Sequence, residues 1–325
     1  MNITRILIVC FSLLYLYSCT SNVKELKEVA CNVVERLYEY PDSTFFSDIR
    51  HAEYEDGKLY LLDTKRGDII WLSEDFKRMD YVARHSEVDL VMPASFTVWQ
   101  DTAYIYDEGS VNSLKIYADG CLVSSVSIPR CNEKRMGVSE SSLFLSLPTD
   151  SSCFIKIEKQ DLTKYILSGR VAKKDTPERT VMLNDNHLFY NSGMLFAVAE
   201  SRPYIDKYDA VTNEWLSAFD LSDIPFMRAN LNFTATKVLG PKSYYVYIDD
   251  CCLYNGYLYL LCASFGDNYH RNTVVKVDVS DTVMKPVCYC VLPGKCYKSI
   301  CVSSDYLYAI CENPCAIEKI RLEDE

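Results

Sequence analysis

The sequence predicts an all-β fold, a six-bladed β-propeller whose last blade is closed by a strand from the N-terminal part of the chain. Three observations predict it. An apolar or aromatic triplet after a polar turn occurs six times, a further strand-like segment follows each triplet, and successive triplets begin 40 to 63 residues apart. One short sheet cannot bury both faces alone, so this spacing favours blades that pack face to face around an axis.

The repeated unit is clearest between residues 54 and 72. The turn Asp56-Gly57 precedes the first triplet, and Asp63 ends that strand with an acid. Asp-Gly, Ser-Gly and Asn-Gly pairs before three of the triplets supply the positive φ that tight hairpins require. The six triplets occupy residues 59–61, 103–105, 143–145, 195–197, 258–260 and 307–309.

A third strand is expected after each triplet, and several of these segments alternate apolar and polar residues, as a sheet with unequal faces does. They occupy residues 69–72, 114–117, 154–157, 204–208, 274–277 and 317–320. A β-sandwich with coincidental repetition is the alternative, but six copies in the same order argue against it. A β-helix would need a much shorter period.

Residues 29–38 form an isolated apolar segment with β-branched Val29, Val33 and Val34 before the first repeat. The sixth repeat is short of a strand, because only a few residues follow 317–322. We therefore expect residues 29–38 to supply the outer strand of the last blade, which removes an open edge from the ring. An N-terminal amphipathic helix is the competing interpretation.

Residues 1–18 have the pattern of an export signal. Arg5 is followed by an apolar stretch, 6–17, that is too short to span a bilayer as a folded helix, and then by Leu16-Tyr17-Ser18-Cys19. This ending resembles a bacterial lipobox, which implies that Cys19 is acylated and anchors the mature chain. A cleaved soluble signal and an uncleaved anchor are the alternatives. The expected organisation is a signal peptide at 1–18, a polar tether at 19–28 and a propeller at 29–325.

Together with the lipobox, the run from 34 to 76 carries a resemblance to a known family. Its features are Asp42-Ser43, Ser47-Asp48-Ile49, the strand 58–63, Ile69-Ile70 and Asp75-Phe76. The chain resembles the six-bladed β-propeller lipoproteins of Bacteroides-type bacteria, which are related to NHL-like propellers. Many relatives have a Gly-Pro-rich loop after the first blade, whereas residues 83–89 here contain neither Gly nor Pro. The resemblance implies an outer-membrane lipoprotein of the cell envelope, facing either side, and no established activity.

Of the 15 cysteines, nine lie between Cys251 and Cys315. An exported protein can keep disulfides. No Cys-x-x-Cys pair occurs, and no His follows a cysteine at a metal-ligand spacing, so a zinc site is not expected. We expect most cysteines to be small buried residues between blades. One or two disulfides in the C-terminal half are also expected.

The sequence contains no nucleophile elbow, no zinc-protease motif, no phosphate-binding loop and no calcium loop, and no cofactor is indicated. His51 and His85 each follow an arginine, Arg50 and Arg84, at what look like equivalent positions of the first two blades. That pairing suggests a functional site, although histidines in surface loops more often have no functional role.

The net charge of −11 makes nucleic acid an unsuitable partner. However, the loops that lead into the blades carry more cations than acids, and in a propeller these loops meet on one face. A basic mouth there would attract anions; scattered charge on solvated loops is the alternative. The long loop 223–247 is a candidate to lean over this mouth. The candidate ligand-binding residues are Arg50, His51, Arg84, His85, Arg135, Arg179, Arg228 and Lys298.

Two functions follow from these expectations. The first is a lipid-anchored binding or scaffold protein that holds a protein partner or an anionic glycan on one propeller face. The second is a hydrolase or lyase with its site in the tunnel, which needs acids or histidines that converge on the axis. The side chains that line the tunnel therefore discriminate between them.

Overall fold

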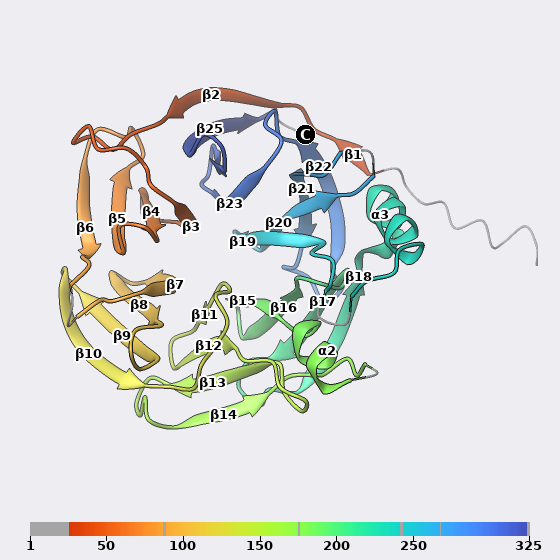
Figure 1. Ribbon diagram of the computed structural model, residues 1–325, viewed down its shortest axis with the longest axis horizontal. Coiled ribbons are helices and arrows are strands. Elements are labelled where there is room, and N and C mark those ends of the chain that lie inside the picture. Colours follow the sequence, from red (N-terminus) through yellow and green to blue (C-terminus); the bar gives the residue numbers. More distant parts are fainter. Residues whose placement is uncertain (1–25, 87–88, 175, 241–242, 267, 324–325) are drawn as a thin grey trace, which may run out of the picture.

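Six sheets stand around a common axis, which confirms the predicted six-bladed β-propeller (Figure 1). The structure is a computed structural model and describes residues 26–323 except 87–88, 175, 241–242 and 267. In blades 1 to 4 the strands are antiparallel and follow chain order from the axis outward, so each of these blades is a four-stranded meander. Blades 5 and 6 are built in the same way, and each carries a strand from the N-terminal part of the chain at its outer edge. The predicted signal segment 1–18 and Cys19 lie outside the described residues.

The bounds of the strands follow the repeats. Blade 1 has β3 (Ile49–Glu55), β4 (Lys58–Asp63), β5 (Asp68–Ser73) and β6 (Met79–Ala83). Blade 2 has β7 (Pro93–Trp99), β8 (Thr102–Asp107), β9 (Ser113–Ala118) and β10 (Cys121–Ser127). Blade 3 has β11 (Gly137–Val138), β12 (Ser142–Ser146), β13 (Phe154–Glu158) and β14 (Tyr165–Ser168). Each predicted triplet in these blades lies in the second strand.

The same order continues in the second half of the ring. Blade 4 has β15 (Asn186–Asn191), β16 (Met194–Ala199), β17 (Tyr204–Asp209) and β18 (Trp215–Asp220). Blade 5 has β19 (Ile248–Tyr254), β20 (Tyr257–Ser264), β21 (His270–Asp278) and β22 (Lys285–Val291). Blade 6 has β23 (Tyr297–Val302), β24 (Leu307–Cys311) and β25 (Ala316–Leu322).

Local sequence explains how the hairpins and blade ends form. At the turn before β4, Asp56 and Gly57 have φ of 47° and 76°, as the expected two-residue hairpin demands. The acid that ends the second strand then caps the loop leading into the same blade. Asp63 accepts hydrogen bonds from the backbone N–H groups of Ser47 and Asp48, at 2.9 and 3.0 Å.

The N-terminal strand closes the ring as predicted. β2 (Cys31–Leu37) pairs antiparallel with β25 and is the outer strand of blade 6, slightly shorter than the expected 29–38. A second contact was not predicted: β1 (Lys27–Glu28) pairs parallel with β22 as a fifth strand of blade 5. The last residues of the expected tether are therefore part of a sheet. We call residues 26–37, which contain β1 and β2, the strap.

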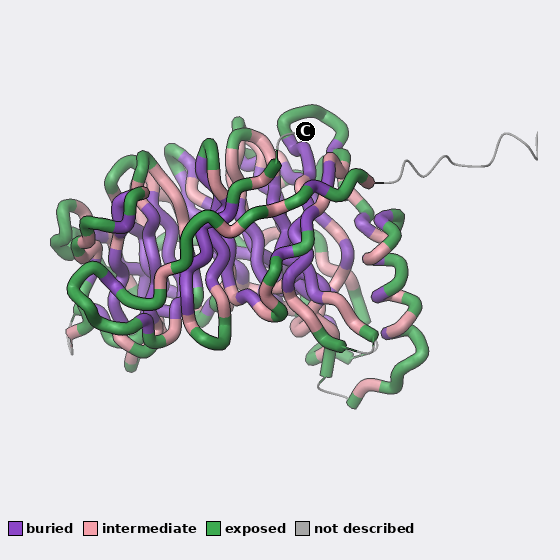
Figure 2. The backbone as a smooth tube through the Cα atoms, turned by 90° about the horizontal axis from the view of Figure 1, so that it is seen from above, coloured by how far each residue is buried: buried purple, intermediate pink, exposed green. Residues whose placement is uncertain are grey.

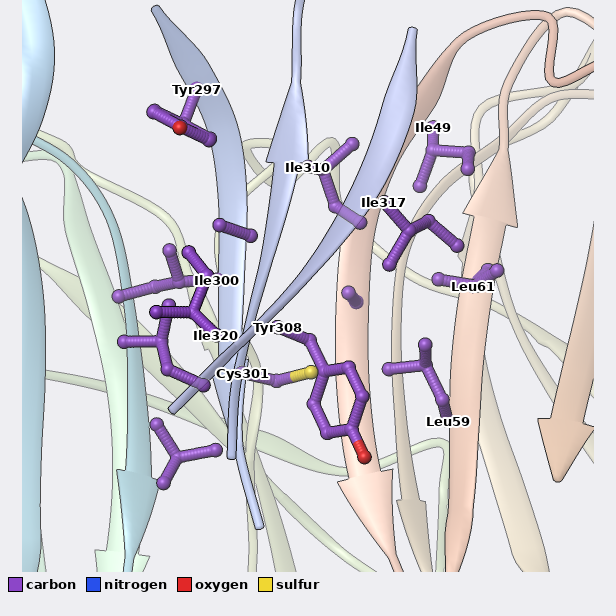
Figure 3. Packing of buried hydrophobic residues seen from close by; sticks show 14 of the residues in the cluster. Ile49, Leu59, Leu61, Tyr297, Ile300, Cys301, Tyr308, Ile310, Ile317 and Ile320 are labelled. Carbon is purple, nitrogen blue, oxygen red and sulfur yellow. The ribbon is translucent and has the colours of Figure 1, made fainter. Parts of the chain in front are cut away.

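The core lies between blades. Across the closing interface, Ile310 and Ile317 of blade 6 face Ile49 and Leu61 of blade 1, and all four side chains are fully buried (Figure 3). Figure 2 shows the same distribution over the molecule, with buried strands in the middle layer and exposed turns on both faces. Because each blade buries its faces only against neighbours, the ring must close for the core to be complete.

The helices lie outside the blades. They are α2 (Pro177–Met182), the 3-10 turn η1 (Leu221–Asp223) and α3 (Pro225–Ala235). On α3, Asn230 donates to the Ala263 carbonyl at 2.7 Å and Phe233 stacks on Phe265, so this part of the loop 223–247 packs on blade 5 (Figure 1). No helix in the described part of the chain is long and apolar enough to cross a membrane.

None of the 13 cysteines that the structure describes forms a disulfide, and eight of them are buried. The expected burial between blades is therefore met for most of them. The disulfides expected in the C-terminal half are not formed in this part of the chain.

Candidate functional site

A central hollow of about 570 Å³ opens on the face where the innermost strands begin. Its walls come from the starts of β3, β15, β19, β21 and β23, from the loop before β11, and from the loops after β8, β16 and β24. This arrangement confirms that the loops leading into the blades meet on one face with the loops between second and third strands. The lining residues are Arg50, His51, Glu108, Arg130, Cys131, Asn132, Glu133, Lys134, Asp185, His187, Glu200, Asp249, Asp250, Arg271, Lys298 and Glu312.

The hollow is not the basic mouth that loop composition suggested. Among its described lining residues, five are cations and seven are acids. Most of the loop cations counted in the sequence lie further out over the blades, because a loop that leads into a blade starts at the rim of the ring. Glu87, Asp175 and Lys242, which belong to the same loops, lie outside the described residues.

Six polar side chains, one from each blade or the loop leading into it, lie around the axis, and three of them, His51, His187 and Asp250, line the hollow. Each stands eight positions before the triplet of its own repeat. In four blades a β-bulge directly precedes this position, so the inner strand is locally irregular there. We call these residues the axial ring; they are His51, Ser95, Arg135, His187, Asp250 and Ser299, and none is more than 7% exposed.

Arg135 is the centre of the axial ring. Its guanidinium is bidentate to Asp250, with Nε–Oδ1 at 2.7 Å and Nη2–Oδ2 at 2.5 Å. It also donates to the Ala52 carbonyl at 2.7 Å and to Ser299 Oγ at 2.8 Å. One buried side chain from the loop before blade 3 thus joins blades 1, 5 and 6. A buried guanidinium needs acceptors for its N–H groups. Here a carboxylate and two further oxygen atoms accept these hydrogen bonds.

The backbone around Arg135 extends this network to the remaining blades. The N–H of Arg135 donates to His187 Nδ1 at 3.4 Å, and its carbonyl accepts from Leu188 at 3.0 Å, both in blade 4. In blade 2, Ser95 Oγ donates to the Lys134 carbonyl at 2.6 Å. Because this segment turns into the ring, β11 is only two residues long. Arg135 was expected to bind ligand at the mouth; instead its guanidinium is buried and bonded within the protein.

Four of the five described cations that line the hollow form ion pairs with acids. Lys134 lies 2.9 Å from Glu200 and 3.7 Å from Asp185. Arg271 contacts Asp249 at 2.9 Å and also Glu312. These two clusters follow the same pattern, a cation held between two acids, so the walls offer acceptors as well as donors.

The outer wall is paired in the same way. Arg50 contacts Glu133, and Lys298 contacts Asp48. These cations are only partly buried, so solvent weakens their pairs, and a ligand can compete for them more easily than for Lys134.

Two imidazoles on the floor retain unused hydrogen-bonding capacity. His51 Nδ1 and His187 Nε2 are buried and have no hydrogen-bond partner within the described chain. Burial, together with the positive charges of Arg135 and Lys134, holds the pKa of both histidines well below the ordinary value. Both rings are therefore neutral near pH 7, and both residues line the hollow. Buried polar atoms without a partner are uncommon in folded proteins.

Two acids of the walls are shifted in the opposite sense. Burial raises the pKa of Glu200 and that of Asp249, although Lys134 and Arg271 partly oppose the effect. A raised pKa makes these two carboxyl groups candidates for proton exchange in the hollow that the neutral imidazoles also line. Among the residues that the structure describes, no three His, Cys, Asp or Glu side chains gather in a way that could hold a metal ion.

The structure brings together some predicted site residues and separates others. Arg50, His51 and Lys298 line the hollow. Arg84 stacks on Tyr81 at the outer strand of blade 1, Arg179 lies on α2, and Arg228 pairs with Asp223 beside α3 at 2.9 Å. These three therefore belong to different places on the periphery.

The expected equivalence of His51 and His85 is wrong. His51 lies on the innermost strand β3, whereas His85 follows the outermost strand β6 and is exposed. The true counterpart of His51 is His187, at the same distance before its triplet. Counting back from the triplets would have found it, together with Asp250 and the rest of the axial ring. The mistake arose because position was judged from the arginine before each histidine.

No protein-family model matches the sequence, and no curated protein does. Solved structures are similar in fold. A protein of Bacteroides fragilis NCTC 9343, described as exported, has a TM-score of 0.57 at 12% identity, over 92% of this chain and 99% of the other. A streptogramin B lyase has a TM-score of 0.53 at 11% identity, over 90% and 98%. A luciferin-regenerating enzyme has a TM-score of 0.54 at 11% identity, over 91% and 95%.

Identities this low show the fold and not the activity, since propellers carry many unrelated functions. Taken with the six sheets and their closure by β2, these likenesses establish that the chain is a six-bladed β-propeller.

Proposed function

We propose that the protein is an exported binding module, tethered to the envelope membrane through Cys19, that holds a polar ligand in the central hollow. The ligand carries both hydrogen-bond donors and acceptors, and it is presented free or at the tip of a glycan or a protein. The observation that carries the proposal is the pair of buried imidazole nitrogens without partners on the floor. A bound polar group would satisfy them.

The charge of the hollow favours a neutral or zwitterionic group over the anionic glycan suggested by loop composition. Four of its five described cations are already paired with acids, and the acids are in excess among the described lining residues. A polyanion would have to displace those acids, whereas a hydroxyl, amide or amino-acid group could bond to both members of a pair.

The binding proposal is tested by a thermal-shift screen of neutral, zwitterionic and anionic saccharides and amino acids, with affinities measured for each compound that stabilises the protein. His51→Phe keeps a ring of similar width and removes both ring nitrogens. We expect it to weaken binding at least about tenfold, the effect of losing one hydrogen bond in a buried site. His85→Phe, on the exposed periphery, is the matched control. Unchanged affinity in His51→Phe, or selective binding of polyanions, would contradict the proposal.

An acid–base enzyme is the second candidate, because Glu200 and Asp249 have raised pKa values beside neutral histidines in the same hollow. The same screen separates the two functions. Compounds that stabilise the protein are incubated with it and analysed by mass spectrometry. Recovery of unchanged compound supports the binding module, whereas a new product that requires Glu200 supports the enzyme.

The tether is tested separately. Metabolic labelling with a palmitate analogue should mark the wild-type chain and not Cys19→Ala, and the variant should leave the membrane fraction. A labelled, membrane-bound Cys19→Ala variant would overturn the lipid anchor without affecting the binding proposal.

A further inference from the structure

The strap crosses from blade 5 to blade 6 at one cysteine. Up to that point it follows β22: Lys27 pairs with Cys288, and the N–H of Val29 donates to the Tyr289 carbonyl at 2.8 Å. Cys31 then begins β2, whose first partner on β25 is Leu322. The thiol of Cys31 still faces blade 5, because its Sγ donates to the Val291 carbonyl at 3.0 Å.

A second thiol lies at the same point. Cys290, the residue before Val291 on β22, is buried in the core cluster against which Cys31 packs, and the two thiols hydrogen-bond to each other. That hydrogen bond lowers the pKa of Cys31 and raises the pKa of Cys290. Of the two thiols, the half-buried Cys31 is therefore the one that ionises more readily, and it is the one more accessible to an external disulfide.

The strap is held weakly by its side chains. Val29 is the one buried residue among residues 26–37; no residue of β1 or β2 is buried (Figure 2). Val34 is 47% exposed. Its attachment consists of backbone ladders, the buried side chain of Val29, half-buried apolar contacts, and a few partly exposed pairs such as Tyr289 with Glu28 at 2.9 Å. A ring that is closed by such a strand opens first where that strand peels away.

We propose that Cys31 and Cys290 form a disulfide that fastens the strap to blade 5 and locks the ring closed. The Cys31 thiolate attacks the S–S bond of a small-molecule or protein disulfide and releases one thiolate of that oxidant. Cys290 loses its proton and attacks the Cys31 sulfur of the mixed disulfide, which releases the second. Two protein thiols are oxidised and one oxidant disulfide is reduced to two thiols. The bond closes a loop of about 260 residues, and long closed loops restrict the unfolded chain most.

Cys288 is the competing partner, because it lies two residues before Cys290 on the same strand and the same side. Its register partner is Lys27, however, and not Cys31. The geometry thus selects Cys290, and Cys288→Ser is a control variant that should leave the cross-link intact.

The test is oxidation of the purified protein with glutathione disulfide, alkylation of the remaining thiols, and peptide mapping without reduction. We expect one cross-linked peptide pair that contains Cys31 and Cys290, with the loss of about 2 Da for two hydrogens. The pair should be absent from Cys31→Ser and Cys290→Ser and present in Cys288→Ser. A Cys31 that is still alkylated after other thiols are oxidised would overturn the proposal.

The locking role is measured on the same samples. Oxidised wild type should melt several degrees above the reduced protein, and amides of β25 opposite β2 should exchange more slowly. Both differences should vanish in Cys31→Ser. A cross-link that forms without raising the melting temperature would reject the lock. Ligand binding in the hollow is measured independently, so failure here is distinguishable from failure of the proposed function.

Discussion

The axial ring and the strap close the same propeller by opposite means. At the axis, Arg135 is 1% exposed and bonds to groups from several blades, so each contact depends on the positions of the others. At the rim, β2 pairs with a single strand and keeps most of its side chains in solvent. The centre of the ring is therefore held by buried polar groups that need hydrogen-bond partners. The outer closure is held mainly by the backbone hydrogen bonds between β2 and β25.

The largest expected effect is at the axis. Arg135→Met removes the partner of Asp250 and leaves a carboxylate buried without compensation. We expect a loss of about 3–5 kcal/mol in the free energy of unfolding, measured by chemical denaturation. The double variant Arg135→Met/Asp250→Asn should recover part of this loss, because the uncompensated charge is gone.

The matched control is on the strap. Val34→Ala truncates an exposed side chain of β2 and should change the free energy of unfolding by no more than about 0.5 kcal/mol. If Arg135→Met cost as little as Val34→Ala, the contrast between the two regions would be wrong.

A smaller effect is expected beneath the axial ring, at Glu53 on β3. Burial, only partly opposed by Arg135, raises the pKa of this carboxyl from 4.5 to about 7. A folded pKa above the unfolded value means that the contribution to stability is fully present below about pH 4.5 and is lost as the pH rises through 7. Glu53→Gln cannot ionise and can still accept the hydrogen bond from the Val98 N–H.

Glu53→Gln should therefore be more stable than wild type at pH 8, by about 2 kcal/mol after allowance for solvent screening. The advantage should shrink toward zero at pH 5. Denaturation curves of both proteins at the two pH values give this difference, and other titrating groups cancel in the comparison. An equal advantage at both pH values would show that Glu53 does not ionise in this range.

The sequence by itself determined the architecture of this protein. Turn pairs such as Asp56-Gly57, the apolar triplets and the acids that end second strands are local signals, and each acts within a few residues of its position. The outer strand of blade 6 was also predictable. The sixth repeat lacks a strand, and an isolated apolar segment before the first repeat can supply it. The parallel pairing of β1 with β22 was not predictable, since two polar residues carry no strand signal.

Only the tertiary structure decided the site. Charge counted along loops predicted a basic mouth, but a loop cation lies at the rim or at the axis according to the path of its backbone. Arg135 and Arg179 look alike in sequence, yet one is buried at the centre and the other lies on a peripheral helix. The axial ring has a sequence signal, the position eight before each triplet. The sequence signal does not show that these six distant residues meet at the axis. Their burial and pairing depend on which residues are neighbours in the folded structure.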